Sequence, residues 1–433
     1  MLFLRRALLP TALLPAPLSA TPVESIEPAV LCDVTIEGDR IAAVARAGAG
    51  LPPAGAESVD AAGALVLPGL VDAHVHLDKA HTWHRAPNRT ATFADALATL
   101  FRDKENWTAG DLERRGEFSL RTAWARGTRV MRTHVDTGLP WGETSHAVMA
   151  SLRARWAGRL ELQTVPLCRV DDFASPAGEQ IADLALRYGA SALGGFAIMS
   201  PDLPRQFDRQ LAIARERGIG LDLHVDENGD AGAECLRLIA EAVLRNQFPH
   251  PVVCGHCCSL AVQSVERQCS TIDLVKAAGI RIISLPMCNL YLQDRREAGR
   301  FPRTPAWRGV TLIHEFLDAG VPVACASDNV RDAFFAYGDF DLLEVYAQSV
   351  RLAHLDTRLA ESVRVVTATA AEIVGRPEFG RVAPGAPAHL VITEARSFSE
   401  LLSRVGGPRR RIDGETVCTP AVPDYRELEQ AGQ

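Results

Sequence analysis

Short apolar runs alternate with longer stretches of helical periodicity from about residue 65 onward. Eight of the apolar runs have the length and composition of buried strands, and each is followed by a stretch long enough for a helix. The eight predicted strands are residues 64–71, 128–133, 161–167, 193–197, 220–223, 251–255, 281–285 and 322–326. This alternation predicts an α/β fold with a parallel sheet.

The helical stretches have recognisable ends. Examples cover residues 202–217 and 231–245, and glycines that suit the end of a helix stand just before later strands. These glycines are Gly127, Gly218, Gly279 and Gly320. Eight βα units over about 300 residues predict a (β/α)8 TIM barrel. A doubly wound sheet is the alternative, but it more often has fewer units and a glycine-rich phosphate loop.

The two ends of the chain differ from this middle part. Residues 1–63 and 378–433 contain short strand-like runs broken by glycine and proline, without long helical periods. We therefore predict two domains. One is a small β-sandwich built from residues 1–63 and 378–433, with residues 46–62 as a loop, and the other is the barrel of residues 64–377.

The N-terminus has two interpretations. Residues 1–20 carry an arginine pair, apolar residues and small residues, as a signal peptide does. However, Pro10, Pro15 and Pro17 interrupt the apolar stretch. The following residues also predict a strand hairpin around Gly38, which needs a partner strand from residues 2–14. We therefore expect a cytoplasmic protein, with export as the alternative if residues 1–20 are a signal peptide cleaved near Thr21.

Composition narrows the range of partners. The chain has 433 residues, a formal net charge of −7 and no long basic run, which disfavours nucleic acids and anionic membranes as partners. The ten cysteines are scattered, and most are expected to be reduced thiols packed in the core. A small-molecule substrate is the expected partner, and the sequence leaves homo-oligomer formation open.

Polar residues close several of the predicted strands. His74 and His76 end the first strand, and because residues i and i+2 of a strand point the same way, both imidazoles face the barrel mouth. His224, His256 and Asp328 stand at the ends of the fifth, sixth and eighth strands. Imidazoles and carboxylates gathered at one rim predict a transition-metal site.

This order of residues resembles the amidohydrolase superfamily. Its members place HxH on the first strand, His on the fifth and sixth, and Asp on the eighth. Binuclear members usually carry a bridging lysine on the fourth strand, where this chain reads GGFAIMS. The resemblance implies one divalent metal ion per chain, Zn or Fe(II), with His74, His76, His224 and Asp328 as ligands.

The segments HLDKAHTW, LPMCNLYLQDR, TPAWRGVTLIHEFLDAGVPVACASDN and YGDFDLLEV look like those of cytosine deaminase and its relatives. In that branch an H-x-x-E motif supplies a proton shuttle, which is Glu227 here. The resemblance gives His256 the role of orienting or deprotonating the attacking water, and Asp328 that of a ligand that also passes a proton onward.

The same resemblance assigns the substrate pocket to Asn289 and Gln293, and two neighbouring positions differ from cytosine deaminases. Leu167 follows the third-strand proline where those enzymes have glutamine, and Asn329 follows Asp328 where they have a second aspartate. We therefore expect a deaminase that releases ammonia from a cytosine- or isocytosine-like heterocycle, with isocytosine preferred over cytosine. Hydrolysis of a cyclic amide or of an N-alkyl aminotriazine is the alternative.

Cys254 and Cys257 have dithiol spacing, and thioredoxin-like chemistry is a weaker alternative because the motif lies late in the chain.

Overall fold

The computed structural model describes residues 1–16, 18, 27–50, 52–138, 140–295 and 303–429, and Thr21 lies outside them. The chain divides into two compact units. The first unit comprises Met1–Ala73, Arg121–Val130 and Asp341–Asp424, and the second comprises His74–Leu120, Met131–Phe340 and Tyr425–Gln433. The predicted domain boundaries near residues 63 and 378 stay a prediction.

The first unit begins with a four-stranded sheet of order β3-β2-β1-β4. Its strands are β1 (Leu2–Pro10), β2 (Ala29–Glu37), β3 (Arg40–Arg46) and β4 (Glu57–Asp60). The predicted hairpin and its partner strand are confirmed, because β2 pairs antiparallel with both β1 and β3. The prediction of a loop over residues 46–62 was wrong in part, since β4 pairs parallel with β1. This pairing satisfies the backbone groups on the edge of β1 that does not face β2.

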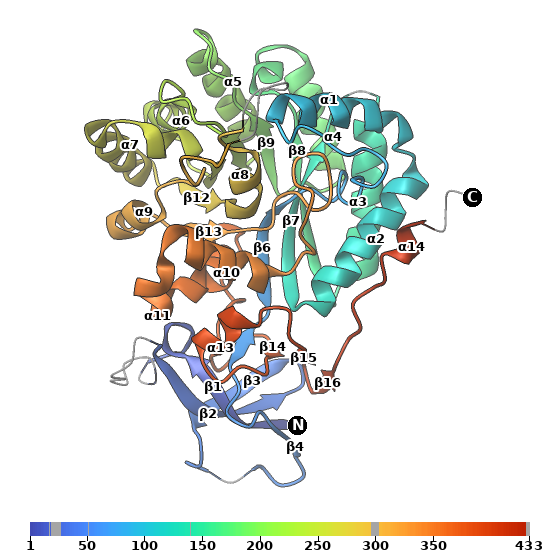
Figure 1. Ribbon diagram of the computed structural model, residues 1–433, viewed down its shortest axis with the longest axis vertical. Helices are drawn as coiled ribbons and strands as arrows, with labels where there is room; N and C mark the ends of the chain where they lie inside the picture. Colours follow the sequence, from blue (N-terminus) through green and yellow to red (C-terminus); the bar gives the residue numbers. More distant parts are fainter. Residues whose placement is uncertain (17, 19–26, 51, 139, 296–302, 430–433) are drawn as a thin grey trace. The chain divides into compact units, whose positions relative to one another are not determined.

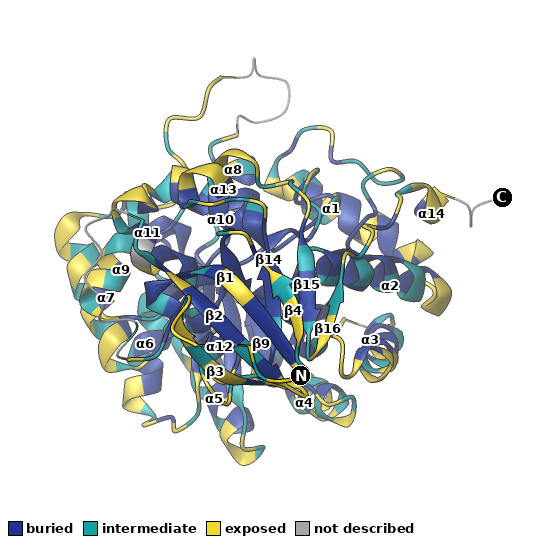
Figure 2. Cartoon of the chain, turned by 90° about the horizontal axis from the view of Figure 1, so that it is seen from below, coloured by how far each residue is buried: buried dark blue, intermediate teal, exposed yellow. Residues whose placement is uncertain are grey.

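A second sheet joins both ends of the chain. Its order is β16-β15-β14-β5, from β5 (Val66–Pro68), β14 (His389–Ile392), β15 (Arg410–Asp413) and β16 (Thr416–Cys418). Leu4 and Val34 share one buried core with Leu390 and Ile412, and Figure 2 shows β1 and β2 buried over much of their length. The helices of this unit are α10 (Leu342–Ala353), α11 (Leu359–Ser362), α12 (Ala368–Ile373) and α13 (Phe398–Ser403).

The prediction of the first strand over residues 64–71 was wrong in part, because Val66–Pro68 form β5 of the second sheet and the strand that carries His74 begins only at Leu70. With this shift, eight strands occupy the region predicted to form the barrel. They are β6 (Leu70–Val75), β7 (Thr128–Asp136), β8 (Glu161–Leu167), β9 (Ala192–Phe196), β10 (Gly220–Val225), β11 (Val252–His256), β12 (Arg281–Ser284) and β13 (Val323–Cys325). They form a sheet β6-β7-β8 and a parallel sheet β13-β12-β11-β10-β9. Single parallel bridges, Val75 to Asp328 and Arg169 to Phe196, link the two sheets, so the ladder is not continuous. The α/β class is confirmed.

Helices alternate with these strands, as Figure 1 shows. They are α1 (Phe93–Asp103), α2 (Ala109–Ala125), α3 (Gly142–Trp156), α4 (Ala177–Arg187), α5 (Leu203–Glu216), α6 (Cys235–Arg245), α7 (Val265–Ala277), α8 (Pro286–Leu292) and α9 (Ile313–Ala319), with α14 (Arg426–Glu429) near the C-terminus. Gly320, which ends α9, has a φ of +81°, a conformation that glycine adopts without strain. Among the described residues, no helix has both the length and the apolar character needed to span a membrane.

Candidate metal centre and active site

The expected metal ligands lie at the carboxyl ends of strands in the second unit. His74 is in β6, His76 directly follows that strand, and His224 is in β10. Asp328 follows β13, where its backbone N–H donates to the carbonyl oxygen of His74 over 2.9 Å. His256 ends β11 with a φ of +70°, and Asp328 has a φ of +60°. Such left-handed residues are uncommon outside glycine and concentrate at functional sites.

The ligand atoms of these residues converge. His224 Nε2 lies 3.1 Å from His74 Nε2 and 3.2 Å from His76 Nε2. His76 Nε2 is also 3.2 Å from Asp328 Oδ1. A tetrahedral zinc ion with nitrogens at about 2.0–2.1 Å sets its ligands about 3.3 Å apart, so the observed spacing fits such an ion.

The charge state of the imidazoles favours a cation. Burial lowers the pKa of His74, His76 and His224 well below its ordinary value, so each ring is neutral and offers a lone pair. The three imidazole nitrogens and the carboxylate oxygen converge on one point, as the ligands of a bound cation do. A divalent metal ion is the group that this donor set suits.

Glu227 and His256 lie beside the ligands. Glu227 Oε1 is 3.5 Å from His256 Nδ1, and its side chain is 16% exposed. Burial, followed by the charge of Asp328, raises the pKa of Glu227 well above its ordinary value. His256 Nδ1 also receives a hydrogen bond from Asn289 Nδ2 at 3.0 Å. The structure therefore brings these two expected acid–base groups together with the ligands.

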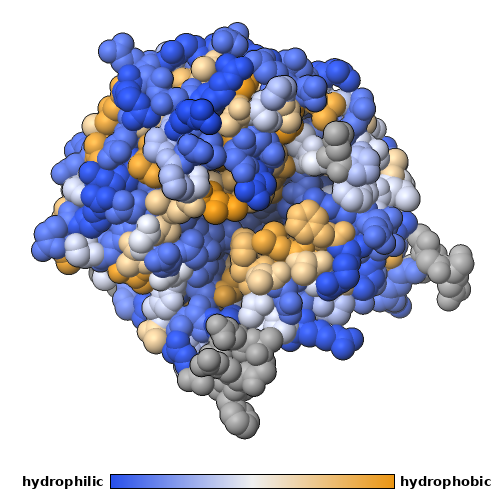
Figure 3. Space-filling model, turned by 90° about the horizontal axis from the view of Figure 1, so that it is seen from above, coloured by the Kyte–Doolittle hydropathy of each residue, from blue (hydrophilic) through white to orange (hydrophobic). Residues whose placement is uncertain are grey.

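A cavity of about 710 Å³ opens next to these groups, and His76, His224, Glu227, His256 and Asp328 are among its lining residues. Its outer wall is apolar and is partly formed by α1. Figure 3 shows a hollow on this face of the second unit, with hydrophobic side chains gathered at its border. The exposed apolar residues that line the cavity are Phe93, Phe101, Ile198 and Met199.

Three of the four expected substrate residues line this cavity, namely Leu167, Gln293 and Asn329. Gln293 Nε2 donates to the carbonyl oxygen of Glu227 over 3.2 Å, and Asn329 Nδ2 donates to Asp332 Oδ2 over 2.7 Å. Asn289 is fully buried and is not among the lining residues, so it contacts His256 and not the cavity.

A buried group behind His74 was missed in the sequence. The ring of His134 lies 4.0 Å from that of His74, and its Nε2 is 3.6 Å from Asp222 Oδ1. Arg132 donates to the other oxygen of Asp222 over 2.9 Å. The signal was present, because the segment RTHVD ends β7 as polar residues end the other strands. No metal-binding sequence motif includes this segment, so the pattern alone does not single out His134.

A second missed group lies in the cavity wall. Asp136 accepts hydrogen bonds from Lys79 Nζ at 2.9 Å, and Lys104 Nζ lies 2.8 Å from its other oxygen. Burial raises the pKa of Asp136, but the two ammonium groups outweigh this and lower it to about 2. All three residues line the cavity, so its wall carries a closely paired set of charges.

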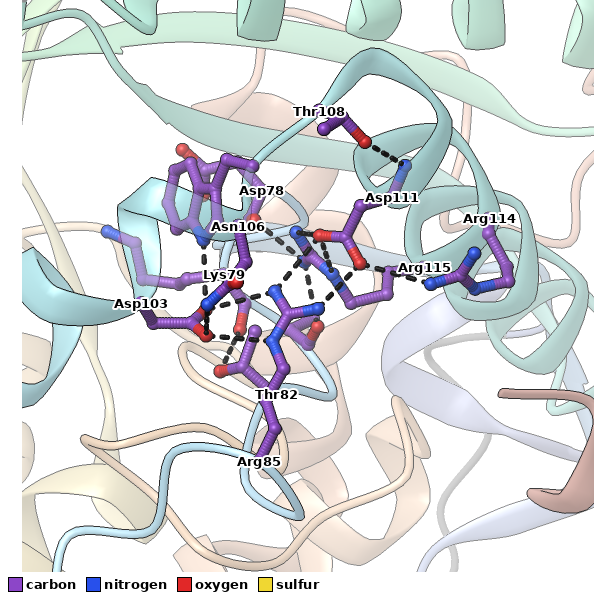
Figure 4. Close-up of polar contacts among 12 residues, drawn as sticks. Asp78, Lys79, Thr82, Arg85, Asp103, Asn106, Thr108, Asp111, Arg114 and Arg115 are labelled. Atoms are coloured by element: carbon purple, nitrogen blue, oxygen red, sulfur yellow. Dashed lines mark hydrogen bonds and ion pairs between the residues drawn. The ribbon is translucent and has the colours of Figure 1, made fainter. Parts of the chain in front are cut away.

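An arginine network fixes the segment that carries part of the cavity wall. Figure 4 shows the guanidinium of Arg85 between the carboxylates of Asp103 and Asp111. Arg115 also bonds to Asp111, and it donates to the backbone oxygen of Asp78 over 2.7 Å. Bidentate guanidinium–carboxylate bonds are strong and directional. They hold α1 and α2 against the loop that follows β6.

The cysteine pair gives no support to redox chemistry. Cys254 and Cys257 are buried free thiols, and burial raises the pKa of both well above its ordinary value. A reactive cysteine needs accessible thiolate, which this environment disfavours.

Comparison with known proteins gives consistent matches. A model of the amidohydrolase family matches residues 150–405, more than half of the chain. A pterin deaminase from Rhizobium rhizogenes is 46% identical over 382 residues, which are 88% of this chain and 86% of that protein. An N-isopropylammelide isopropyl amidohydrolase from a Pseudomonas species is 25% identical, over 84% of this chain and 88% of that protein.

Solved structures share the fold. 5-Methylcytosine deaminase from Klebsiella pneumoniae with phosphonocytosine matches with a TM-score of 0.83 and 23% identity, over 98% of this chain and 99% of that one. Atrazine chlorohydrolase from Arthrobacter aurescens complexed with zinc matches with a TM-score of 0.67 and 17% identity, over 99% and 98%. These matches confirm the resemblance to the amidohydrolase superfamily and the expectation of a deaminase that acts on cyclic amidines. The chain belongs to the amidohydrolase family.

Proposed function

We propose that this protein is a metal-dependent deaminase that releases ammonia from a pterin-like heterocycle. The observation that carries this proposal is the convergence of three neutral imidazoles and Asp328 at a cavity that also holds Glu227. These groups combine a metal site with an acid–base side chain at one end of a space large enough for a bicyclic ring.

One divalent metal ion per chain, Zn or Fe(II), would be held by His74, His76, His224 and Asp328. Support comes from the donor set and from β9, which contains no lysine to bridge a second ion. Bound there, the metal supplies Lewis acidity and activates water near neutral pH. A zinc complex of a structural relative is consistent with zinc as the ion.

The remaining steps are assigned to side chains of this protein. Water adds to the ring carbon that carries the amino group, the carbon–nitrogen bond breaks, and a ring carbonyl and ammonia are formed. Glu227 would deliver a proton to the neighbouring ring nitrogen and then to the leaving amine. His256 would orient the attacking water. Asp328 would take up the proton that this water loses and pass it onward.

The substrate class rests on the cavity and on the 46% identical relative, whose name specifies pterin. Pterin has the amino and oxo groups of isocytosine on a fused bicyclic ring. A water molecule occupies about 30 Å³ in the liquid, and each of the twelve non-hydrogen atoms of pterin needs less than that. The pterin ring system therefore fills less than about 360 Å³. The cavity of about 710 Å³ therefore has room for a ring larger than cytosine.

The test is ammonia release from pterin, isocytosine, cytosine, an N-alkyl aminotriazine and a cyclic amide. We expect pterin to have the highest kcat/KM. Glu227→Gln should keep its metal and lose about 10²–10⁴ in turnover. Glu234→Gln, which affects a carboxylate paired with Arg267 outside the cavity lining, is the control. Ring opening without ammonia, or alkylamine release from the triazine as the fastest reaction, would favour the alternative hydrolase.

Three further proposals concern the whole chain. The eight strands β6–β13 would close into one (β/α)8 barrel, because structural relatives match over nearly the whole chain. The small domain would comprise residues 1–63 and 378–433. The protein would act in the cytoplasm on a small heterocycle, which N-terminal sequencing of the native protein can check.

A further inference from the structure

The loop after β13, residues 329–340, forms one wall of the active-site cavity. Asn329 and Phe334 from this loop line the cavity, and the ring of Phe334 lies 5.8 Å from that of Phe93 on α1. Lys79 Nζ lies 5.9 Å from the centre of the same ring. The position of this loop therefore contributes to the shape of the cavity.

The loop is tied together by its own hydrogen bonds. Asp332 accepts from Asn329 Nδ2 through one oxygen, and from the backbone N–H groups of Phe334 and Phe335 through the other. The backbone N–H of Arg331 donates to the oxygen of Tyr337 over 2.9 Å. These bonds connect Asn329 to Asp332 and Arg331 to Tyr337, so a contact that holds Arg331 also restrains the part of the loop that carries Asn329.

Tyr425, from the C-terminal segment, contacts both ends of this loop. Its hydroxyl donates to Asp339 Oδ1 over 2.5 Å, and the guanidinium of Arg331 lies 4.2 Å from the centre of its ring. A cation–π contact and a hydrogen bond to a carboxylate each stabilise the relative position of the groups that they join. Tyr425 therefore holds the loop at two points that lie eight residues apart.

The same tyrosine reaches the loop after β6. Its ring lies 5.5 Å from that of Phe118 and 6.0 Å from that of His81. The backbone N–H of His81 donates to the oxygen of Val330 over 3.0 Å, and that of Trp83 donates to Arg331 over 2.7 Å. The two loops that border the cavity on this side are thus joined to each other and to Tyr425.

We propose that Tyr425 is a positioning residue for substrate binding, through which the C-terminal segment holds the cavity loop 329–340 in place. Tyr425 itself is not among the cavity-lining residues, so it acts through Arg331 and Asp339 on Asn329 and Phe334. The kinetic part of this inference rests on the proposed deaminase function, whereas the structural part does not.

Tyr425→Ala should raise the KM for pterin about tenfold, since it removes both the cation–π contact and the hydrogen bond. The metal content and kcat should change little. Tyr425→Phe keeps the ring under Arg331 and loses only the bond to Asp339, so it should restore most of the binding. Tyr188→Ala is the matched control, because its ring stacks on His146 outside the cavity lining.

Amide hydrogen exchange of the metal-loaded enzyme gives a second measurement. Residues 329–340 should exchange faster in Tyr425→Ala than in the wild type and the control, with Tyr425→Phe in between. The proposal would be overturned if Tyr425→Ala exchanged residues 329–340 at the wild-type rate. It would also be overturned if Tyr425→Ala were active with the same KM as the wild type. If the wild type deaminates no heterocycle, the proposed function fails while the exchange experiment still decides the role of Tyr425. If Tyr425→Ala does not fold, Tyr425→Phe and Asp339→Ala each still remove the hydrogen bond between these residues, and both should speed up exchange in residues 329–340. Wild-type exchange in both variants would overturn the proposal.

Discussion

Asn289 Nδ2 donates a hydrogen bond to Nδ1 of His256 over 3.0 Å. A neutral imidazole that accepts at Nδ1 carries its proton on Nε2. Burial lowers the pKa of His256 to about 3, so the ring is neutral at ordinary pH. Asn289 thus fixes the tautomer in which His256 can donate from Nε2. Of the two roles expected from the sequence, this tautomer favours orienting the water over deprotonating it.

Replacing Asn289 should lower activity through His256. Asn289→Leu removes the donor and should reduce kcat/KM about 10–100-fold, as is usual for groups that orient residues at a metal site. Asn289→Asp offers only an acceptor to Nδ1 and should not rescue activity. Steady-state kinetics with metal analysis would check this. Wild-type turnover in Asn289→Asp would show that the side chain accepts from His256.

His76→Ala should remove both metal and activity. The substitution leaves two imidazoles and one carboxylate, and it deletes the nitrogen that lies 3.2 Å from both His224 Nε2 and Asp328 Oδ1. Elemental analysis should give one equivalent of zinc or iron in the wild type and much less in the variant. His250→Ala, outside the cluster, is the control. Two equivalents in the wild type would contradict a single-metal site.

The sequence predicted the strands and the convergence of the candidate ligands, because both follow local rules. Apolar runs separated by helical stretches locate β6–β13, and strand-end histidines share one rim whatever the details of packing. The contribution of the side chain of Asn289 depends on how α8 packs behind His256, which no local pattern encodes. His134 was missed for the same reason, since its burial against His74 is a tertiary contact. Strand β4 was missed because it exists only as a partner of the distant β1.

His81 should make the protein less stable as the pH falls. Burial lowers its pKa to about 3 from an ordinary value of 6.5. Below pH 6.5 the unfolded chain takes up a proton that the folded chain does not, so the free energy of unfolding decreases by about 1.4 kcal/mol per pH unit, or about 2 kcal/mol at pH 5. Above pH 6.5 this contribution vanishes.

His81→Phe should reduce this dependence, because phenylalanine does not titrate and the site is surrounded by Phe118, Phe340 and Tyr425. Denaturant unfolding of both proteins near pH 7.5 and pH 5 would measure the difference. His84→Phe, at an exposed position nearby, should keep the wild-type dependence. Equal pH dependence in wild type and His81→Phe would mean that other groups cause the acid sensitivity.

Leu167→Gln should shift preference from pterin and isocytosine toward cytosine. Leu167 lines the cavity and ends β8, at the position where the resemblance places a substrate-binding glutamine in cytosine deaminases. A primary amide can donate to a ring carbonyl and accept from a ring N–H, whereas leucine can do neither. A buried polar edge without a partner costs about 1–3 kcal/mol, so the substitution should raise the kcat/KM ratio of cytosine to isocytosine about tenfold or more. Leu97→Gln makes the same change at a lining residue of α1, and it should leave the ratio unaltered. Both variants place an amide in the same cavity. A general effect of polarity would therefore change the cytosine-to-isocytosine ratio in both variants, whereas a specific contact with the ring would change it only in Leu167→Gln. An unchanged ratio in Leu167→Gln would mean that another side chain, such as Gln293, already meets the edge of the ring.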